Sequence, residues 1–104
     1  MEIRIFTTQN NKSPFQEWIK DLPKSIRLRI YQRFSRIENG NFGDYQNLKG
    51  GLYELRFHFD SGLRVYYTKN GNEITIILCG GNKKTQKKDI IMARELLEQI
   101  KEEK

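Results

Sequence analysis

The chain has 104 residues, with 19 Lys and Arg against 13 Asp and Glu, so its formal net charge is +6. This length suits one domain spanning residues 1–104, because it leaves no room for a second hydrophobic core. No apolar run reaches the ~18 residues of a membrane span, and the first ten residues do not resemble a secretory signal. A single cysteine, Cys79, excludes an internal disulfide and a multi-cysteine zinc site. We expect a cytoplasmic domain without metal or other cofactor, whose excess of cations favours an anionic partner.

The first half predicts a strand and two helices. Residues 1–8 alternate weakly and indicate a strand. Ser13 and Pro14 are typical of a helix start, because a serine caps backbone N–H groups and a proline fits the first turn. A second helix is expected over residues 24–38, where five cations against one acid give a local excess of +4. Residues 43–51 are predicted to form a loop.

Three stretches in the second half alternate between apolar and polar residues and predict an antiparallel meander. They cover residues 53–59, 63–68 and 74–79. Asn70-Gly71 favours a two-residue turn, which would set Tyr67 opposite Ile74. Matching the apolar faces of the first hairpin favours a three-residue turn over 60–62, with Gly62 left-handed.

A last helix is expected after Gly80-Gly81, capped by Thr85 or a neighbour. The predicted order of elements is β-α-α-β-β-β-α. This order indicates an α+β fold in which the helices pack on one face of an antiparallel sheet.

The expected pairing places polar side chains on the sheet face away from the core. Arg56 lies opposite Tyr66, His58 opposite Arg64 and Glu54 opposite Thr68. Four lysines follow the last strand, namely Lys83, Lys84, Lys87 and Lys88. Arginine forks grip phosphate oxygens and lysines add positive charge, so this face suits a phosphodiester. An ordinary solvated sheet face explains the same pattern without any function.

Cleavage of RNA without a metal needs a base for the 2′-OH, an acid for the leaving oxygen and cations for the phosphorane. The candidates are Glu54 or His58 as base, Arg56, Arg64 and Lys83 on the phosphate, and Tyr66 as the stacking partner of a nucleobase.

Four segments carry a family resemblance. They read Tyr-Glu-Leu-Arg at 53–56, Gly-Leu-Arg-Val-Tyr-Tyr at 62–67, Leu-Cys-Gly-Gly-Asn-Lys-Lys-Thr-Gln at 78–86 and Asp-Ile-x-x-Ala at 89–93. The chain resembles the RelE/ParE toxin superfamily in these segments, and also in its length and in the order of its elements. Within that superfamily it is most similar to the phage-derived, HigB-like group of addiction-module killer proteins.

The resemblance implies the toxin half of a bacterial type II toxin–antitoxin pair. RelE- and HigB-like members bind the ribosome and cut mRNA in the decoding site, with the 2′-OH as nucleophile and no metal. A cognate antitoxin, usually with a helix-turn-helix domain, neutralises the toxin. The complex represses its own operon, so operator DNA is contacted through the antitoxin.

Residue by residue, the resemblance assigns basic site positions to Arg56, Arg64 and Lys83. The chain departs from RelE in two places. Glu54 stands where RelE has its first catalytic lysine, and Lys88 or Asp89 stands near the position of its C-terminal tyrosine. His58 and Asp89 are therefore the candidate substitutes for the acid and base, while Lys84, Lys87 and Lys88 are candidates for RNA binding.

Two other functions compete with an mRNA endonuclease. A ParE-like toxin would inhibit DNA gyrase by binding alone, although such members typically lack the cationic set that Arg56, Arg64 and Lys83 provide. A plain RNA- or DNA-binding module would bind with strong salt dependence and cut nothing.

Overall fold

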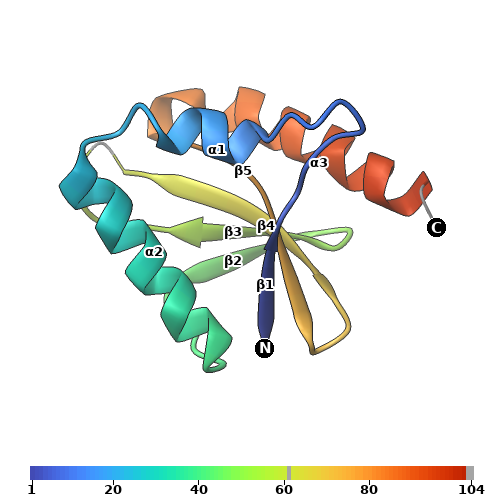
Figure 1. The fold of residues 1–104 in the computed structure, drawn as a ribbon, viewed down its shortest axis with the longest axis horizontal. Coiled ribbons are helices and arrows are strands. Elements are labelled where there is room, and N and C mark those ends of the chain that lie inside the picture. Colours follow the sequence, from blue (N-terminus) through green and yellow to red (C-terminus); the bar gives the residue numbers. More distant parts are fainter. Residues whose placement is uncertain (61, 103–104) are drawn as a thin grey trace.

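The computed structural model describes residues 1–60 and 62–102, which form one five-stranded sheet and helices on both of its faces (Figure 1). The elements are β1 (Glu2–Ile5), α1 (Pro14–Ile19), α2 (Lys24–Glu38), β2 (Tyr45–Lys49), β3 (Leu52–Arg56), β4 (Arg64–Asn70), β5 (Ile74–Gly81), the 3₁₀ turn η1 (Lys83–Thr85) and α3 (Gln86–Glu102). The strands are ordered β1-β5-β4-β3-β2. The α+β class is confirmed. The sheet is mixed and not wholly antiparallel, because β1 runs parallel to β5.

Helix α1 begins where the sequence predicts. The Ser13 hydroxyl accepts a hydrogen bond from the Gln16 backbone N–H at 3.2 Å, and Pro14 occupies the first turn. Such a cap satisfies an N–H group that has no partner within the helix. The helix then buries Phe15 and Ile19 against the sheet.

Strand β2 occupies the segment that was predicted to be a loop. It pairs antiparallel with β3, with Tyr45 opposite Leu55 and Gln46 opposite Glu54. The strand lies at the edge of the sheet and its side chains are exposed, apart from the half-buried Leu48. An exposed edge strand needs no alternation of apolar residues, so the periodic signal used to predict strands is missing.

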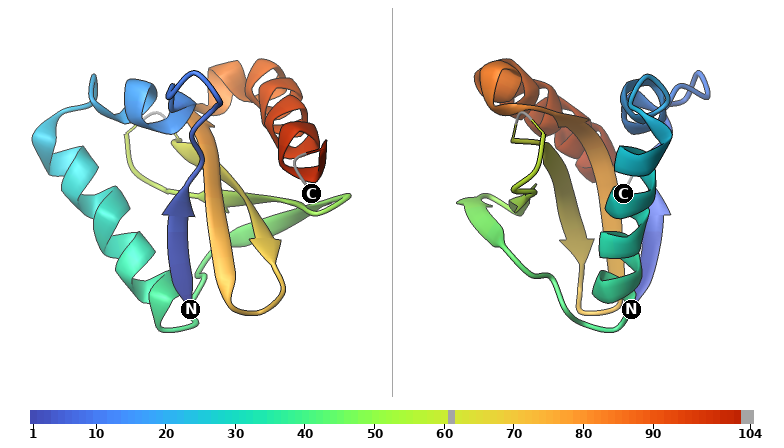
Figure 2. Two further views of the ribbon diagram at one scale, coloured as in Figure 1. Left: turned by 45° about the vertical axis from the view of Figure 1, so that its right-hand side comes forward. Right: turned by 90° about the vertical axis from the view of Figure 1, so that its left-hand side faces the viewer.

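The prediction that the helices share one face is wrong, because the sheet lies between two helical layers (Figure 2). One core joins α1 and α2 to the first face, and a second core joins α3 to the opposite face. Four consecutive β4 residues, from Val65 to Thr68, are buried, as a strand covered on both faces requires. Tyr66 and Thr68, expected on a solvated face, are therefore buried.

The β3–β4 hairpin keeps its predicted faces but shifts by two residues. Glu54 pairs with Tyr66 and Arg56 with Arg64. The connecting loop is longer than predicted, and both Asp60 and Gly62 are left-handed, with φ of 55° and 73°. Residue 61 of the predicted turn lies outside the described residues. A shift of two preserves which side chains share a face, so the apolar pattern does not distinguish the two registers.

The predicted two-residue turn at Asn70-Gly71 is also wrong. Asn70 pairs with Ile74 across a three-residue loop, and Tyr67 pairs with Ile77 instead of Ile74. The pairing shifts again between Tyr66 and Tyr67. Strand β5 is covered on both faces, and Ile77 and Cys79, which the alternation placed on the polar face, are buried too. The alternation of its sequence therefore does not select one register.

Gly80 and Gly81 give β5 room for close neighbours. A Cβ atom at Gly80 would overlap the Trp18 ring of the α1 segment, and one at Gly81 would overlap the Asp89 carboxylate of α3. The pair therefore lets elements from both helical layers approach the end of β5, directly before Lys83.

We expect Gly80→Ala to lower the free energy of unfolding by about 1–3 kcal/mol, because the added methyl group overpacks the contact with Trp18. Urea denaturation measures this cost. In a Trp18→Leu background the same substitution should cost less, since the ring is gone. An equal cost in both backgrounds would contradict the assignment to Trp18.

Candidate functional site

An open groove of about 450 Å³ lies where β3 ends and β4 begins. Its lining consists of Arg56, Phe57, His58, Asp60, Gly62, Arg64 and Lys83. The structure thus brings together four of the residues singled out from sequence, namely Arg56, His58, Arg64 and Lys83. They come from the ends of β3 and β4, the loop between them and η1. We refer to this site as the phosphate groove, after the phosphate that its cations are expected from the sequence to bind.

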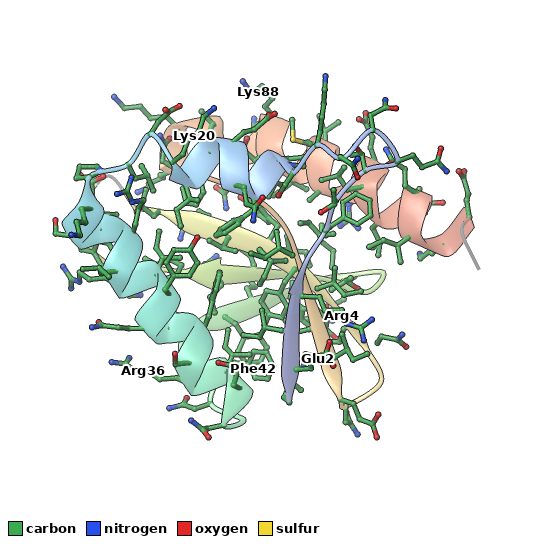
Figure 3. All side chains as sticks on the ribbon, in the orientation of Figure 1. Glu2, Arg4, Lys20, Arg36, Phe42 and Lys88 are labelled. Carbon is green, nitrogen blue, oxygen red and sulfur yellow. The ribbon has the colours of Figure 1, made fainter. Side chains whose placement is uncertain are left out.

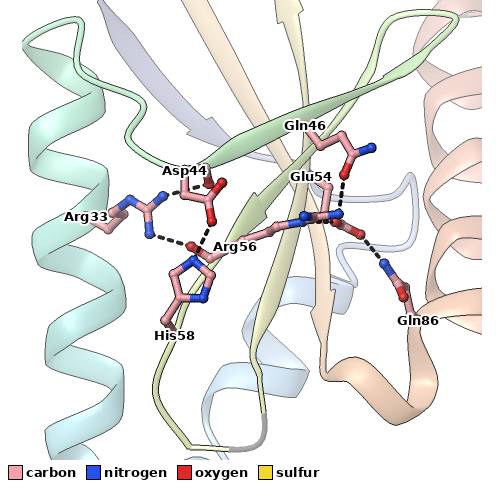
Figure 4. Close-up of polar contacts among 7 residues, drawn as sticks. All are labelled: Arg33, Asp44, Gln46, Glu54, Arg56, His58 and Gln86. Atoms are coloured by element: carbon pink, nitrogen blue, oxygen red, sulfur yellow. Dashed lines mark hydrogen bonds and ion pairs between the residues drawn. The ribbon is translucent and has the colours of Figure 1, made fainter.

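Arg56 is held in place by a buried carboxylate. Its Nε donates to Glu54 Oε1 at 2.8 Å, and Gln86 Nε2 donates to Glu54 Oε2 at 2.8 Å (Figure 4). The Gln46 side chain also accepts from the Arg56 guanidinium. The hydrogen bond with Glu54 raises the pKa of Arg56, so this cation stays charged. Glu54 is fully buried and does not line the groove, which makes it an anchor for Arg56.

Arg64 lies directly opposite Arg56 and has a donor without an acceptor. Its Nε is buried and makes no hydrogen bond to any residue that the structure describes. Leaving a buried donor unsatisfied is costly, particularly when the group is charged. An anion in the groove would be attracted by both arginines, which line it from neighbouring strands.

His58 stands on the rim of the groove and is paired with a carboxylate. Its Nε2 contacts Asp44 Oδ2, and its side chain is 76% exposed (Figure 4). When Nε2 carries the hydrogen and donates to Asp44, Nδ1 becomes the proton acceptor. Sequence reasoning missed Asp44, because it lies just before the unpredicted strand β2 and no spacing relates it to His58.

Arg33 of α2 ties these segments together through backbone oxygens. It donates to the carbonyls of Arg56 at 2.7 Å, Asp44 at 2.9 Å and Phe42 at 3.2 Å. Its guanidinium also lies over the Phe57 ring, 4.9 Å from the centroid. Partial burial lowers the pKa of Arg33. The sequence marked this residue only as one of several cations on a basic helix.

Tyr66 and Asp89 were expected at the site but lie outside the groove. Tyr66 is fully buried beneath α3, so the prediction that it stacks on a nucleobase is wrong for this conformation. Burial also raises its pKa, which keeps the hydroxyl neutral. Asp89 is buried against Gly81 and accepts a hydrogen bond from the Thr85 hydroxyl.

The remaining predicted cations are on the surface beside the groove. Lys84 belongs to η1, and Lys87 and Lys88 belong to the first turn of α3. Figure 3 shows Lys88 on the outer surface of that helix. All three are exposed, and none lines the groove. Within residues 1–60 and 62–102, no three His, Cys, Asp or Glu side chains gather closely enough to hold a metal ion. In the same residues, no helix is both long and apolar enough to cross a membrane.

Comparison with known proteins gives the family. Residues 17–98 match the family described as Phage derived protein Gp49-like (DUF891), which is more than half of the chain. The chain belongs to this family. A Haemophilus influenzae protein, described only as uncharacterized, is 38% identical to this Gp49-like chain over 102 residues. That alignment covers 96% of this chain and 98% of the relative. The family match includes the whole phosphate groove, whereas β1 lies before it.

Proposed function

We propose that this Gp49-like protein is the toxin of a type II toxin–antitoxin system and cleaves mRNA on the ribosome without a metal. One observation carries the proposal: Arg56, Arg64 and Lys83 converge on a groove whose rim holds a histidine paired with a carboxylate. The resemblance to RelE- and HigB-like toxins supports the same activity.

The cations of the phosphate groove are suited to the scissile phosphate. Arg56 and Arg64 present guanidinium groups from neighbouring strands, and such groups bind two phosphate oxygens at once. Negative charge builds up on these oxygens as the pentacoordinate phosphorane forms. Donors that are fixed in position before the reaction stabilise this charge without having to reorganise.

His58 is suited to be the general base. In the proposed step, Nδ1 accepts the proton of the 2′-OH while the 2′ oxygen forms a bond to the adjacent phosphorus. The bond from phosphorus to the 5′ oxygen breaks, which leaves a 2′,3′-cyclic phosphate and a 5′-OH. Asp44 orients the ring and stabilises the imidazolium that forms.

The 5′ oxygen needs a proton as it leaves. Arginine does not release protons near neutral pH, so Arg56 and Arg64 act as charges alone. We assign Lys83 as the proton donor, because its ammonium lines the same groove and can recover a proton from water. Each proton and bond is thereby accounted for with groups of this chain and water.

The proposed partners are mRNA, the ribosome and a cognate antitoxin. In this scheme the antitoxin carries a helix-turn-helix domain, neutralises the toxin and contacts operator DNA. The set of Arg56, Arg64 and Lys83 favours this function over ParE-like inhibition of gyrase, since such inhibition needs no cationic catalytic groove.

Induced expression with and without the neighbouring gene tests the proposal. We expect growth arrest and new mRNA 5′ ends within codons, both dependent on translation and both suppressed by the neighbouring gene. Growth arrest with intact mRNA and loss of gyrase supercoiling activity would contradict it, as would the absence of any arrest.

A further inference from the structure

A second basic groove adjoins the phosphate groove on the side of α2. It has a volume of about 240 Å³ and is lined by Arg29, Gln32, Arg33, Arg36, Phe57, His58 and Phe59. Three of these residues are arginines and none is acidic. Phe57 and His58 line both grooves, so the two sites meet at the histidine. We call this second site the α2 groove.

The arginines of the α2 groove differ in what they can bind. Arg33 donates to three carbonyls of its own chain. Arg29 instead lies over the Phe59 ring at 3.9 Å from the centroid, an arrangement that orients the guanidinium while its N–H edge can still bind an oxygen. Arg36 is exposed two helical turns further along α2. Arg29 and Arg36 are thus about 10 Å apart along the helix axis.

We propose that the α2 groove binds the phosphates that flank the cleaved bond, so that a single RNA strand runs from the phosphate groove past His58 to Arg36. This inference rests on the proposed function. A groove that presents several cations and no acidic side chain is typical of sites that follow a nucleic-acid backbone. An acidic segment of a protein is the competing occupant. Continuity with the phosphate groove favours RNA, because a protein segment has no need to pass the histidine.

The test compares Arg29→Gln/Arg36→Gln with Arg27→Gln, which removes a cation from the same helix outside the groove. Arg27 donates only to the Lys20 carbonyl among the residues described. Binding is measured by fluorescence anisotropy with 2′-deoxy oligonucleotides of two and six nucleotides, which cannot be cleaved by 2′-OH attack. For the six-nucleotide strand, log affinity decreases with log salt, and we expect this dependence to be less steep by about 1.4 in the double variant, because two phosphate contacts are lost. Arg27→Gln and the two-nucleotide strand should show little change.

Equal slopes for the double variant and Arg27→Gln would overturn the inference, as would an absence of binding by the parent protein. The inference would also be overturned if the double variant kept the parent's slopes for the oligonucleotides but lost binding of a polyglutamate peptide. That result would favour a protein segment as the occupant. Thermal unfolding shows whether each variant is folded. If the parent binds as expected but cuts no mRNA during translation, the proposed function fails while the strand path stands. If it cuts mRNA and the slopes are equal, only the strand path fails.

Discussion

Replacing Arg64 by alanine is expected to slow mRNA cleavage by about 10²–10³-fold, because one preorganised contact to the reacting phosphate is lost. The rate is measured with purified protein in a reconstituted translation reaction. Arg27→Ala is the matched control, since it removes the same charge from a residue that does not line the phosphate groove. Cleavage at the parent rate by Arg64→Ala would remove this residue from the mechanism.

The same substitution should leave the fold intact. The Arg64 Nε has no hydrogen-bond partner among the described residues, and a second arginine faces it across the strand pair. Its removal therefore breaks no internal hydrogen bond of that nitrogen. A residue that is unfavourable for the fold but useful for binding an anion is the pattern expected at a functional site. Urea denaturation that shows a large loss of stability would contradict this interpretation.

Replacing His58 by alanine is expected to slow cleavage by about 10²–10⁴-fold, the usual contribution of a general base. Asp60→Asn is the control, because Asp60 is another side chain of the groove that can accept a proton. Single-turnover rates on ribosome-bound mRNA separate the chemical step from substrate binding. If Asp60→Asn abolishes cleavage and His58→Ala does not, the base has been assigned to the wrong residue.

Asp44 acts through His58 in this scheme, so the two substitutions should not be additive. Asp44→Asn should slow cleavage when the histidine is present and should add little to His58→Ala. Equal effects of Asp44→Asn in both backgrounds would show that the carboxylate acts independently of the ring.

Much of the phosphate groove follows from the sequence because strand alternation fixes faces. Arg56 and Arg64 were expected on one face, and they remain neighbours although the register differs by two residues. Lys83 is close because it follows β5 directly. The start of α1 could also be predicted from the sequence, since capping by Ser13 depends on residues that are close in the chain.

The second helical layer could not be read from the same pattern. Tyr66 and Thr68 carry polar groups and occur on solvated sheet faces as well as on buried ones. Their presence therefore does not indicate that α3 covers this face of the sheet. Glu54 is the clearest case, because carboxylates are rarely fully buried unless they are paired. Its charged partner Arg56 is only two positions away, but its second partner Gln86 lies 32 positions away in the chain, and no local signal links Gln86 to Glu54.

Arg33 has a consequence for how substrate binding proceeds. One guanidinium holds the backbone of Arg56, which binds phosphate in the proposed mechanism, and of Asp44, which orients the base. The backbones of Arg56 and Asp44 are thus fixed relative to each other when the protein folds, before any RNA is present. Little entropy then remains to be lost on ordering the site, so more of the contact energy appears as affinity and as rate.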